Sequence, residues 1–172
     1  MSRAHRLRPA PRGFTLVEVA VVLAVVMLLL GLSVPSMSSW LGRQRLRAAA
    51  EGLSADMNLA RLEAARSGRP VHLSFNAAYP WCYALGLSAG ADCRWPDAQV
   101  LTVVNAADHP GVRLISAAPA LFGPRPAKPQ GTAPSHGRFA SDQGEQITVR
   151  LSRLGRPGLC APEAPLPPLG AC

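Results

Sequence analysis

Glu18 is the residue whose surroundings pose the clearest chemical question in this sequence. It is the one ionisable residue in the 21-residue run from Phe14 to Val34. As a helix, this run is about 30 Å long, the thickness of the hydrocarbon core of a bilayer. A carboxylate at the centre of that core costs roughly 2.5–3.5 kcal/mol, and less near an interface. Because the run holds no cation, we expect Glu18 to pair with the α-amine of a neighbouring chain, created near Phe14.

The four cysteines form a second group with defined chemistry. They make two near pairs, Cys82 with Cys93 and Cys160 with Cys172, and all lie after the apolar run. An even number suits an oxidising compartment. Four cysteines allow three pairings, and we expect the local one, with about 3 kcal/mol of stabilisation from each bridge. Zinc is the competing interpretation, but there is no Cys-x-x-Cys motif and the histidines are scattered. We therefore predict no metal and no cofactor.

One motif is typical of a hydrolase. The run Gly86-Leu87-Ser88-Ala89-Gly90 matches the G-x-S-x-G pattern, and aspartate and histidine residues follow in the expected order. That pattern requires a strand leading into a helix, whereas the short strands here and nearby Cys93 indicate a hairpin loop. No phosphate-binding loop or dinucleotide fingerprint is present. We therefore expect that the protein is not an enzyme.

A long helix must position Glu18, and its second half changes character. From residue 46 to 64, apolar residues recur at alternating spacings of four and three, which indicates one buried face. These residues are Leu46, Ala50, Leu53, Met57, Ala60 and Ala64. Pro35 is expected to kink the helix, and Gly68 and Pro70 to end it after Ser67. Trp40 lies about 39 Å beyond Phe14 along the helix, where it suits either lipid headgroups or packing in a domain.

Short strands are predicted after Gly68. Short β-like runs separated by Pro, Gly, Asn and Asp cover residues 71–76, 81–87, 99–105, 111–116 and 145–153, and the first and last of these alternate apolar and polar residues. Residues 123–137 are rich in proline and glycine and predict a long loop, and the proline-rich tail after Cys160 is excluded from a central strand. A long helix on antiparallel sheet is an α+β arrangement. We expect four segments: a leader (1–13), a membrane half of the helix (14–35), an amphipathic half (36–67) and a β-rich domain (68–172).

The net charge of +8 comes partly from the leader, which holds four of the 18 Lys and Arg residues. Charge alone is therefore a weak argument for nucleic-acid binding. The leader arginines favour a cytoplasmic N-terminus, although Arg43, Arg45 and Arg47 follow the far end of the apolar run and reduce this bias. Together with the cysteines, the charge pattern predicts that residues after about 36 lie in the periplasm.

Gly13-Phe14-Thr15-Leu16-Val17-Glu18, behind a basic leader, resembles the prepilin peptidase site of type IV pilins and type II secretion pseudopilins. The resemblance implies cleavage between Gly13 and Phe14 and methylation of the new N-terminal Phe14. It also implies that Glu18 neutralises the amine of an adjacent subunit during filament assembly. An ordinary secretory signal would be cleaved after its apolar run. A plain signal anchor with a chance glutamate is the alternative.

Two later stretches, residues 81–93 and 152–160, resemble the GspH/FimT group of minor pseudopilins. In FimT-like members linked to natural transformation, a Gly-Arg-x-Arg motif near the C-terminus binds DNA. The corresponding run here is Gly155-Arg156-Pro157-Gly158, which keeps the first arginine but has Gly158 in place of the second. Arg150 and Arg153 would join Arg156 in a basic patch. The alternative for these arginines is a solvated strand edge that resists aggregation.

These resemblances imply a pilin-like fold and a minor pseudopilin, a structural subunit of a type II secretion pseudopilus or a type IV pilus. The expected partners are other pilins, the prepilin peptidase and an inner-membrane assembly platform. A DNA-binding minor pilin for DNA uptake is the alternative function. The expected location is the bacterial inner membrane, crossed once, with the C-terminal domain in the periplasm until the subunit joins its filament. Both filament systems use the same assembly chemistry, so the sequence does not separate them.

Overall fold

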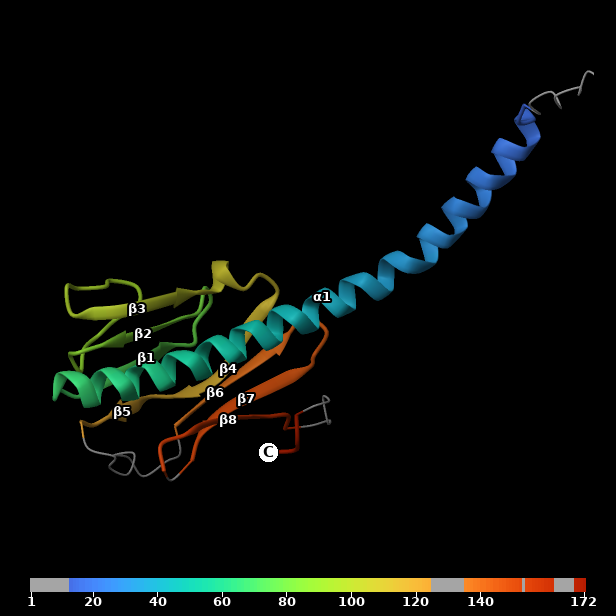
Figure 1. The fold of residues 1–172 in the computed structure, drawn as a ribbon. Helices are drawn as coiled ribbons and strands as arrows, with labels where there is room; N and C mark the ends of the chain where they lie inside the picture. Colours follow the sequence, from blue (N-terminus) through green and yellow to red (C-terminus); the bar gives the residue numbers. More distant parts are fainter. Residues whose placement is uncertain (1–12, 125–134, 153, 163–168) are drawn as a thin grey trace, which may run out of the picture. The chain divides into compact units, whose positions relative to one another are not determined.

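The computed structural model describes residues 13–124, 135–152, 154–162 and 169–172, except the side chains of residues 32–36. Within these residues, one long helix, α1 (Leu16–Ser67), precedes two four-stranded sheets and a short 3-10 helix, η1 (Ala106–Asp108) (Figure 1). The chain forms two compact units, residues 1–38 and residues 39–172. The predicted leader, residues 1–13, lies outside the described residues except for Gly13.

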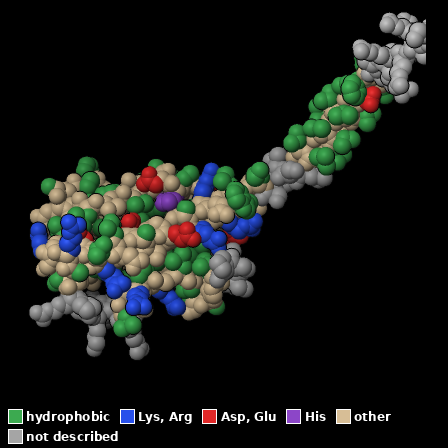
Figure 2. Space-filling model, in the orientation of Figure 1, with side chains coloured by type: hydrophobic (Ala, Val, Ile, Leu, Met, Phe, Trp, Pro, Cys, Tyr) green, Lys and Arg blue, Asp and Glu red, His purple; other side chains and the backbone are tan. Residues whose placement is uncertain are grey.

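In the first unit, α1 begins with a polar cap. The backbone N–H of Glu18 donates to Oγ1 of Thr15 at 3.2 Å. Thr15 and Glu18 have the spacing of a capping box, and a carboxylate in the first turn also favours the positive end of the helix dipole. From Phe14 to Gly31 every side chain is exposed, and all except those of Thr15 and Glu18 are apolar (Figure 2). No helix in the described part of the chain is long and apolar enough to cross a membrane.

In the second unit, every strand pairing is antiparallel. The first sheet has the order β3-β2-β1-β5, and the second has the order β4-β6-β7-β8. The strands of the first sheet are β1 (Val71–Asn76), β2 (Cys82–Gly86), β3 (Val100–Asn105) and β5 (Ala120–Phe122). Those of the second are β4 (Val112–Ala118), β6 (His136–Ser141), β7 (Gln146–Leu151) and β8 (Pro157–Cys160).

Residues 39–67 of α1 pack on both sheets around one core (Figure 1). The six apolar residues predicted to form the buried face, from Leu46 to Ala64, are each at most 1% exposed. Trp81 joins the sheets at the centre: its Nε1–H donates to the carbonyl of Val112 at 2.7 Å, and its ring meets Phe139 edge-on at 5.4 Å between centroids. Gly137 on β6 provides space for the helix, because a Cβ there would lie 2.6 Å from Cδ2 of Leu53.

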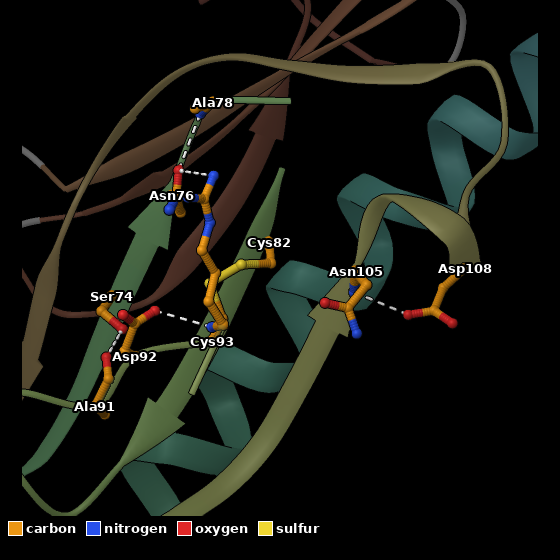
Figure 3. The surroundings of a disulfide bond; sticks show 10 residues. Ser74, Asn76, Ala78, Cys82, Ala91, Asp92, Cys93, Asn105 and Asp108 are labelled. Atoms are coloured by element: carbon orange, nitrogen blue, oxygen red, sulfur yellow. Dashed lines mark hydrogen bonds between the residues drawn. A yellow bond between two sulfur atoms is a disulfide. The ribbon is translucent and has the colours of Figure 1, made fainter. Parts of the chain in front are cut away.

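Each disulfide fastens a segment next to a sheet. Cys82 on β2 pairs with Cys93, with Cα atoms 5.8 Å apart, so the loop of residues 87–99 folds over the outer face of the first sheet (Figure 3). There the hydroxyl of Ser74 donates to the carbonyl of Ala91. Cys160 on β8 pairs with Cys172, at 4.9 Å between Cα atoms, and returns the described end of the tail to that strand. Both bridges follow the local pairing expected from the sequence.

Five strand predictions are right, and three strands were missed. The five predicted runs contain or overlap β1, β2, β3, β4 and β7. The structure adds β5, β6 and β8, and β6 begins at His136, inside the predicted loop of residues 123–137. Strand β6 contains glycine and alanine, which have low strand propensity. Strand β8 begins with proline, which is tolerated at the first position of an edge strand. Residues 125–134 lie outside the described part.

A hydrogen bond between Asp56 and Tyr83 links the helix to the first sheet. The phenol of Tyr83 on β2 donates to Oδ2 of Asp56 on α1 at 2.8 Å. Burial raises the pKa of Asp56 above 3.8, and the bond from Tyr83 partly opposes this rise. Burial, followed by the neighbouring Asp56 charge, raises the pKa of Tyr83 strongly. Tyr83 therefore remains a neutral donor at physiological pH.

Removing this hydroxyl should destabilise the second unit in a pH-dependent way. We expect Tyr83→Phe to lower the free energy of unfolding at neutral pH by about 2 kcal/mol, because the lost bond has a charged acceptor. The folded-state pKa of Asp56 lies above its ordinary value, so this carboxyl contributes stability that is present at low pH and lost as pH rises through that pKa. The substitution should raise this pKa further, so the difference from wild type should grow as pH rises above about 4.

The measurement is denaturant unfolding followed by circular dichroism between about pH 4 and pH 7. Tyr79→Phe is the matched control, since Tyr79 is 82% exposed. It should change the free energy of unfolding by less than about 0.5 kcal/mol. Equal effects from the two substitutions would contradict the role given to the Asp56 bond.

Candidate functional sites

The predicted cleavage position lies immediately before the helix. Residues 13–15 are outside any helix or strand, and α1 starts at Leu16. Gly13 is exposed, and Phe14 is 79% exposed. An exposed, non-helical peptide bond is accessible to a protease, whereas a bond inside the hydrogen-bonded helix is not. The geometry is compatible with cutting between Gly13 and Phe14.

Glu18 lies one turn into the helix and points to solvent. Its backbone N–H is capped by Thr15, but its carboxylate has no ion-pair partner among the described residues. The surrounding side chains of the first unit are apolar (Figure 2). The carboxylate is therefore an isolated charge on an apolar surface, and it is accessible to a cation from another molecule.

The predicted basic patch forms only in part. Arg150 is exposed on β7, while its neighbours Val149 and Leu151 are buried, so Arg150 lies on the outer face of the second sheet. A depression of about 600 Å³ brings Arg150 together with Arg156, and no acidic residue lines it in the described part of the chain. Its other lining residues are Leu151, Ser152, Gly158, Leu159, Cys160 and Ala171. Arg153 lies outside the described residues.

Two basic residues near this depression were missed by sequence reasoning. His136 and Arg138 alternate with the buried positions of β6, and His136 is the cross-strand partner of Arg150. Arg138 donates from Nε to Oγ1 of Thr148 at 3.3 Å, and His136 hydrogen-bonds Ser116 at 3.0 Å. Basic side chains gather on the side of the second unit where β7 and β8 lie (Figures 1 and 2). The signal in the sequence was the His-Gly-Arg-Phe alternation, hidden by the proline-rich run before it.

The register of β7 and β8 bears on the altered motif. Gly158, which stands where the Gly-Arg-x-Arg motif has its second arginine, pairs directly with Arg150. Directly opposed residues on neighbouring strands have side chains on the same face, about 5 Å apart at Cβ. Gly158 has no side chain, so the space that the second arginine of the motif would occupy is empty. Arg150, on the neighbouring strand β7, places its guanidinium beside this space.

The hydrolase motif has a structural setting unlike that of a nucleophile. Strand β2 leads from Gly86 into a loop, and Ser88 lies in a turn closed by the Ala91 N–H donating to the Ser88 carbonyl at 3.3 Å. The Ser88 hydroxyl is buried and has no hydrogen-bond partner among the described residues. Among the described residues, no histidine or carboxylate is hydrogen-bonded to it. Among these residues no cluster of three metal-ligating side chains occurs, and all four cysteines are in disulfides.

Comparison with known proteins gives two family matches. The model described as Type II transport protein GspH matches residues 49–155, and the prokaryotic N-terminal methylation motif matches residues 8–34. Among curated proteins, none matches the chain significantly.

Two crystal structures of the type IV minor pilin FimU from Pseudomonas aeruginosa (strain PAO1) share this fold. The P21 form has a TM-score of 0.55 at 18% identity, covering 71% of this chain and 96% of that chain. The P65 form has a TM-score of 0.52 at 18% identity, covering 69% and 98%. The α+β pilin-like fold expected from the sequence is thus confirmed. With the GspH model spanning more than half of the sequence, the chain belongs to the Type II transport protein GspH family and is a minor pseudopilin of the GspH/FimT type.

Proposed function

We propose that this pilus or pseudopilus subunit is cut by a prepilin peptidase between Gly13 and Phe14, and that Glu18 then pairs with the N-terminal amine of a neighbouring subunit. The observation that carries the proposal is the isolated carboxylate of Glu18 on the apolar surface of α1. The methylation motif spans this segment. A charge pair in a water-poor filament interior is far stronger than one in water, so a single carboxylate is enough to select an amine.

The proposed sequence of events starts in the inner membrane, which residues 14–34 would cross, with the second unit in the periplasm. The exposed apolar side chains from Phe14 to Gly31 support this, since they must be covered by lipid or by other helices. After the cut, an assembly platform moves the subunit from lipid into the filament. The two environments are similarly apolar, so Glu18 supplies the difference that favours the filament.

Glu18 also has a local role that must be separated from assembly. The Thr15 hydroxyl caps the helix by accepting a hydrogen bond from the backbone N–H of Glu18, and loss of a cap typically costs about 1 kcal/mol. A glutamine at position 18 can still complete a capping box but carries no charge. The pair of variants described below therefore distinguishes helix capping from charge pairing.

Maturation should depend on Gly13. We expect Gly13→Ala to leave the leader attached, because the peptidase must accommodate the residue next to the cut. A Cβ at position 13 would meet no atom within 4 Å, so the substitution should leave folding unchanged. Intact-mass spectrometry of the purified protein measures the outcome. A methylated Phe14 N-terminus in the variant, or an uncut and functional wild type, would refute the proposed processing.

Assembly should depend on the charge of Glu18. We expect Glu18→Gln to remain in the membrane fraction but to reduce incorporation into sheared filaments about tenfold or more, because the charge-assisted bond to the amine is lost. Thr15→Ala, which removes the cap and keeps the charge, is the control and should assemble. Immunoblots of membrane and filament fractions give the ratio. Normal incorporation of Glu18→Gln would leave only the capping role.

DNA binding is a second candidate function, favoured by the depression that holds Arg150 and Arg156 and that no acidic residue lines in the described part of the chain. His136 and Arg138 extend the basic face across β6. Phosphate contacts of this kind release counterions, so the affinity would fall steeply with salt. This function is compatible with filament assembly, since the outer face of the second sheet is not part of α1.

Charge reversal tests this second function. In gel shifts of the full chain in detergent with duplex DNA, Arg150→Glu and Arg156→Glu should each weaken binding and reduce the salt slope by about one. Arg66→Glu, which makes the same charge change at an exposed residue of the last helical turn, is the matched control. Equal losses in all three variants would indicate non-specific attraction, and unchanged binding would exclude this face.

A further inference from the structure

A second pocket lies within the second unit, between α1 and the turn that joins β6 to β7. Its volume is about 160 Å³. Leu46 and Ile147 supply apolar walls, and Trp40, Arg43, Arg47 and Glu145 supply an indole and charges of both signs. Trp40 is 51% exposed, so the indole is accessible from solvent. A small pocket with an aromatic wall and opposite charges suits a ligand that is itself zwitterionic.

The charges in this pocket are incompletely balanced. Arg43 Nη1 lies 3.4 Å from Oε1 of Glu145. The other oxygen, Oε2 of Glu145, is buried and has no hydrogen-bond partner among the described residues. Arg47 lies on the same wall, with Nε 3.9 Å from Glu51. A buried carboxylate oxygen without a donor is unfavourable, so a small rotation of the Glu145 carboxylate that brings this oxygen to a donor in the pocket, preferably a cation, would be favourable.

The position along the chain limits which ligands are nearby. Arg43 follows Pro35 by about eight helical residues, a path of about 12 Å, and Trp40 is nearer still. The headgroup layer next to a bilayer core is about 5–8 Å thick, and arginine side chains extend several ångströms along an apolar surface to reach it. Met37, Leu41 and Arg45 are also exposed. Exposed apolar residues with tryptophan and arginine are typical of a membrane–water interface.

We propose that this pocket binds the headgroup of a phosphoethanolamine lipid. The inference rests on the membrane-anchored state under Proposed function. The lipid phosphate contacts the guanidinium groups of Arg43 and Arg47, the ammonium donates to the carboxylate of Glu145, and Trp40 covers the glycerol. An anionic headgroup without an amine would leave the Glu145 carboxylate facing a negative charge. A choline headgroup has the charge but no N–H to donate, so ethanolamine fits best.

This assignment also explains the arginines that follow the apolar run. Arg43 and Arg47 oppose the rule that basic residues favour the cytoplasmic side. Bound to lipid phosphate, they hold the emerging helix at the periplasmic surface. The lipid would be released when the subunit leaves the membrane.

The test measures phospholipid retained by the purified full chain in mild detergent, using native mass spectrometry with equal amounts of dioleoyl phosphatidylethanolamine, phosphatidylcholine and phosphatidylglycerol. Wild type should retain the ethanolamine lipid about tenfold more than the choline lipid, the factor expected for one charge-assisted bond. Glu145→Gln should remove most of this preference. Arg47→Gln should lower retention of all three lipids about tenfold.

Arg45→Gln is the matched control, because it removes the same charge from an exposed position of the same helix outside the pocket. It should retain lipid like wild type, and thermal unfolding should show that all variants are folded. Glycerophosphoethanolamine should displace the lipid, whereas inorganic phosphate should not. Glu18→Gln should retain lipid normally even if it fails to assemble, so the result is independent of filament incorporation.

Four outcomes would overturn the proposal. Equal retention of ethanolamine and choline lipids by wild type would show that Glu145 recognises no ammonium. Equal losses in Arg45→Gln and Arg47→Gln would show general attraction to the membrane surface. Displacement by inorganic phosphate as effective as by glycerophosphoethanolamine would reduce the pocket to an anion site. Absence of retained lipid in every form would leave the pocket to a protein partner.

Discussion

The second unit depends on one face of α1 that packs against both sheets. Small residues on α1, among them Ala50, Ala60 and Ala64, are fully buried and let the strands approach the helix closely. The larger Leu53 and Met57 then fill the space between the sheets, and Gly137 makes room for Leu53. Trp81 completes the arrangement, because its hydrogen bond to Val112 ties the first sheet to the second across the core. Close packing of this kind makes any change in volume costly.

This constraint fixes where function can be placed. The inner faces of both sheets are occupied by the core, and the loop held by Cys93 covers the outer face of the first sheet (Figure 3). The outer face of the second sheet carries Arg138, which is partly buried, and Arg150, which is exposed. The N-terminal part of α1 holds the isolated Glu18. Proposed assembly chemistry and proposed surface recognition thus lie on different elements.

The sequence predicted the helix well because its buried apolar residues recur with the helical period of about 3.6 residues. The spacing from Leu46 to Ala64 identified its buried face, and Gly68 identified its end. It predicted strands where apolar and polar residues alternate, as in β1 and β7, and where a short apolar run lies between turn residues, as in β2. Strands β6 and β8 were missed because tertiary pairing, and not local propensity, makes them strands.

For the candidate sites, local motifs located Gly13, Phe14 and Glu18, whose roles remain predictions. The depression near Arg150 required the register of β7 against β6 and β8, which no local pattern encodes. The pocket of Trp40 and Glu145 joins residues about a hundred positions apart and was likewise outside the reach of sequence periodicity.

The bond between Asp56 and Tyr83 makes the two tyrosines chemically unequal. Tyr83 is buried beside a carboxylate that disfavours the phenolate, whereas Tyr79 is open to water. In alkaline solution the raised pKa of Tyr83 will therefore delay the ultraviolet absorbance of its phenolate until the domain opens. The protein carries its own optical probe of the contact between helix and sheet, without any attached dye.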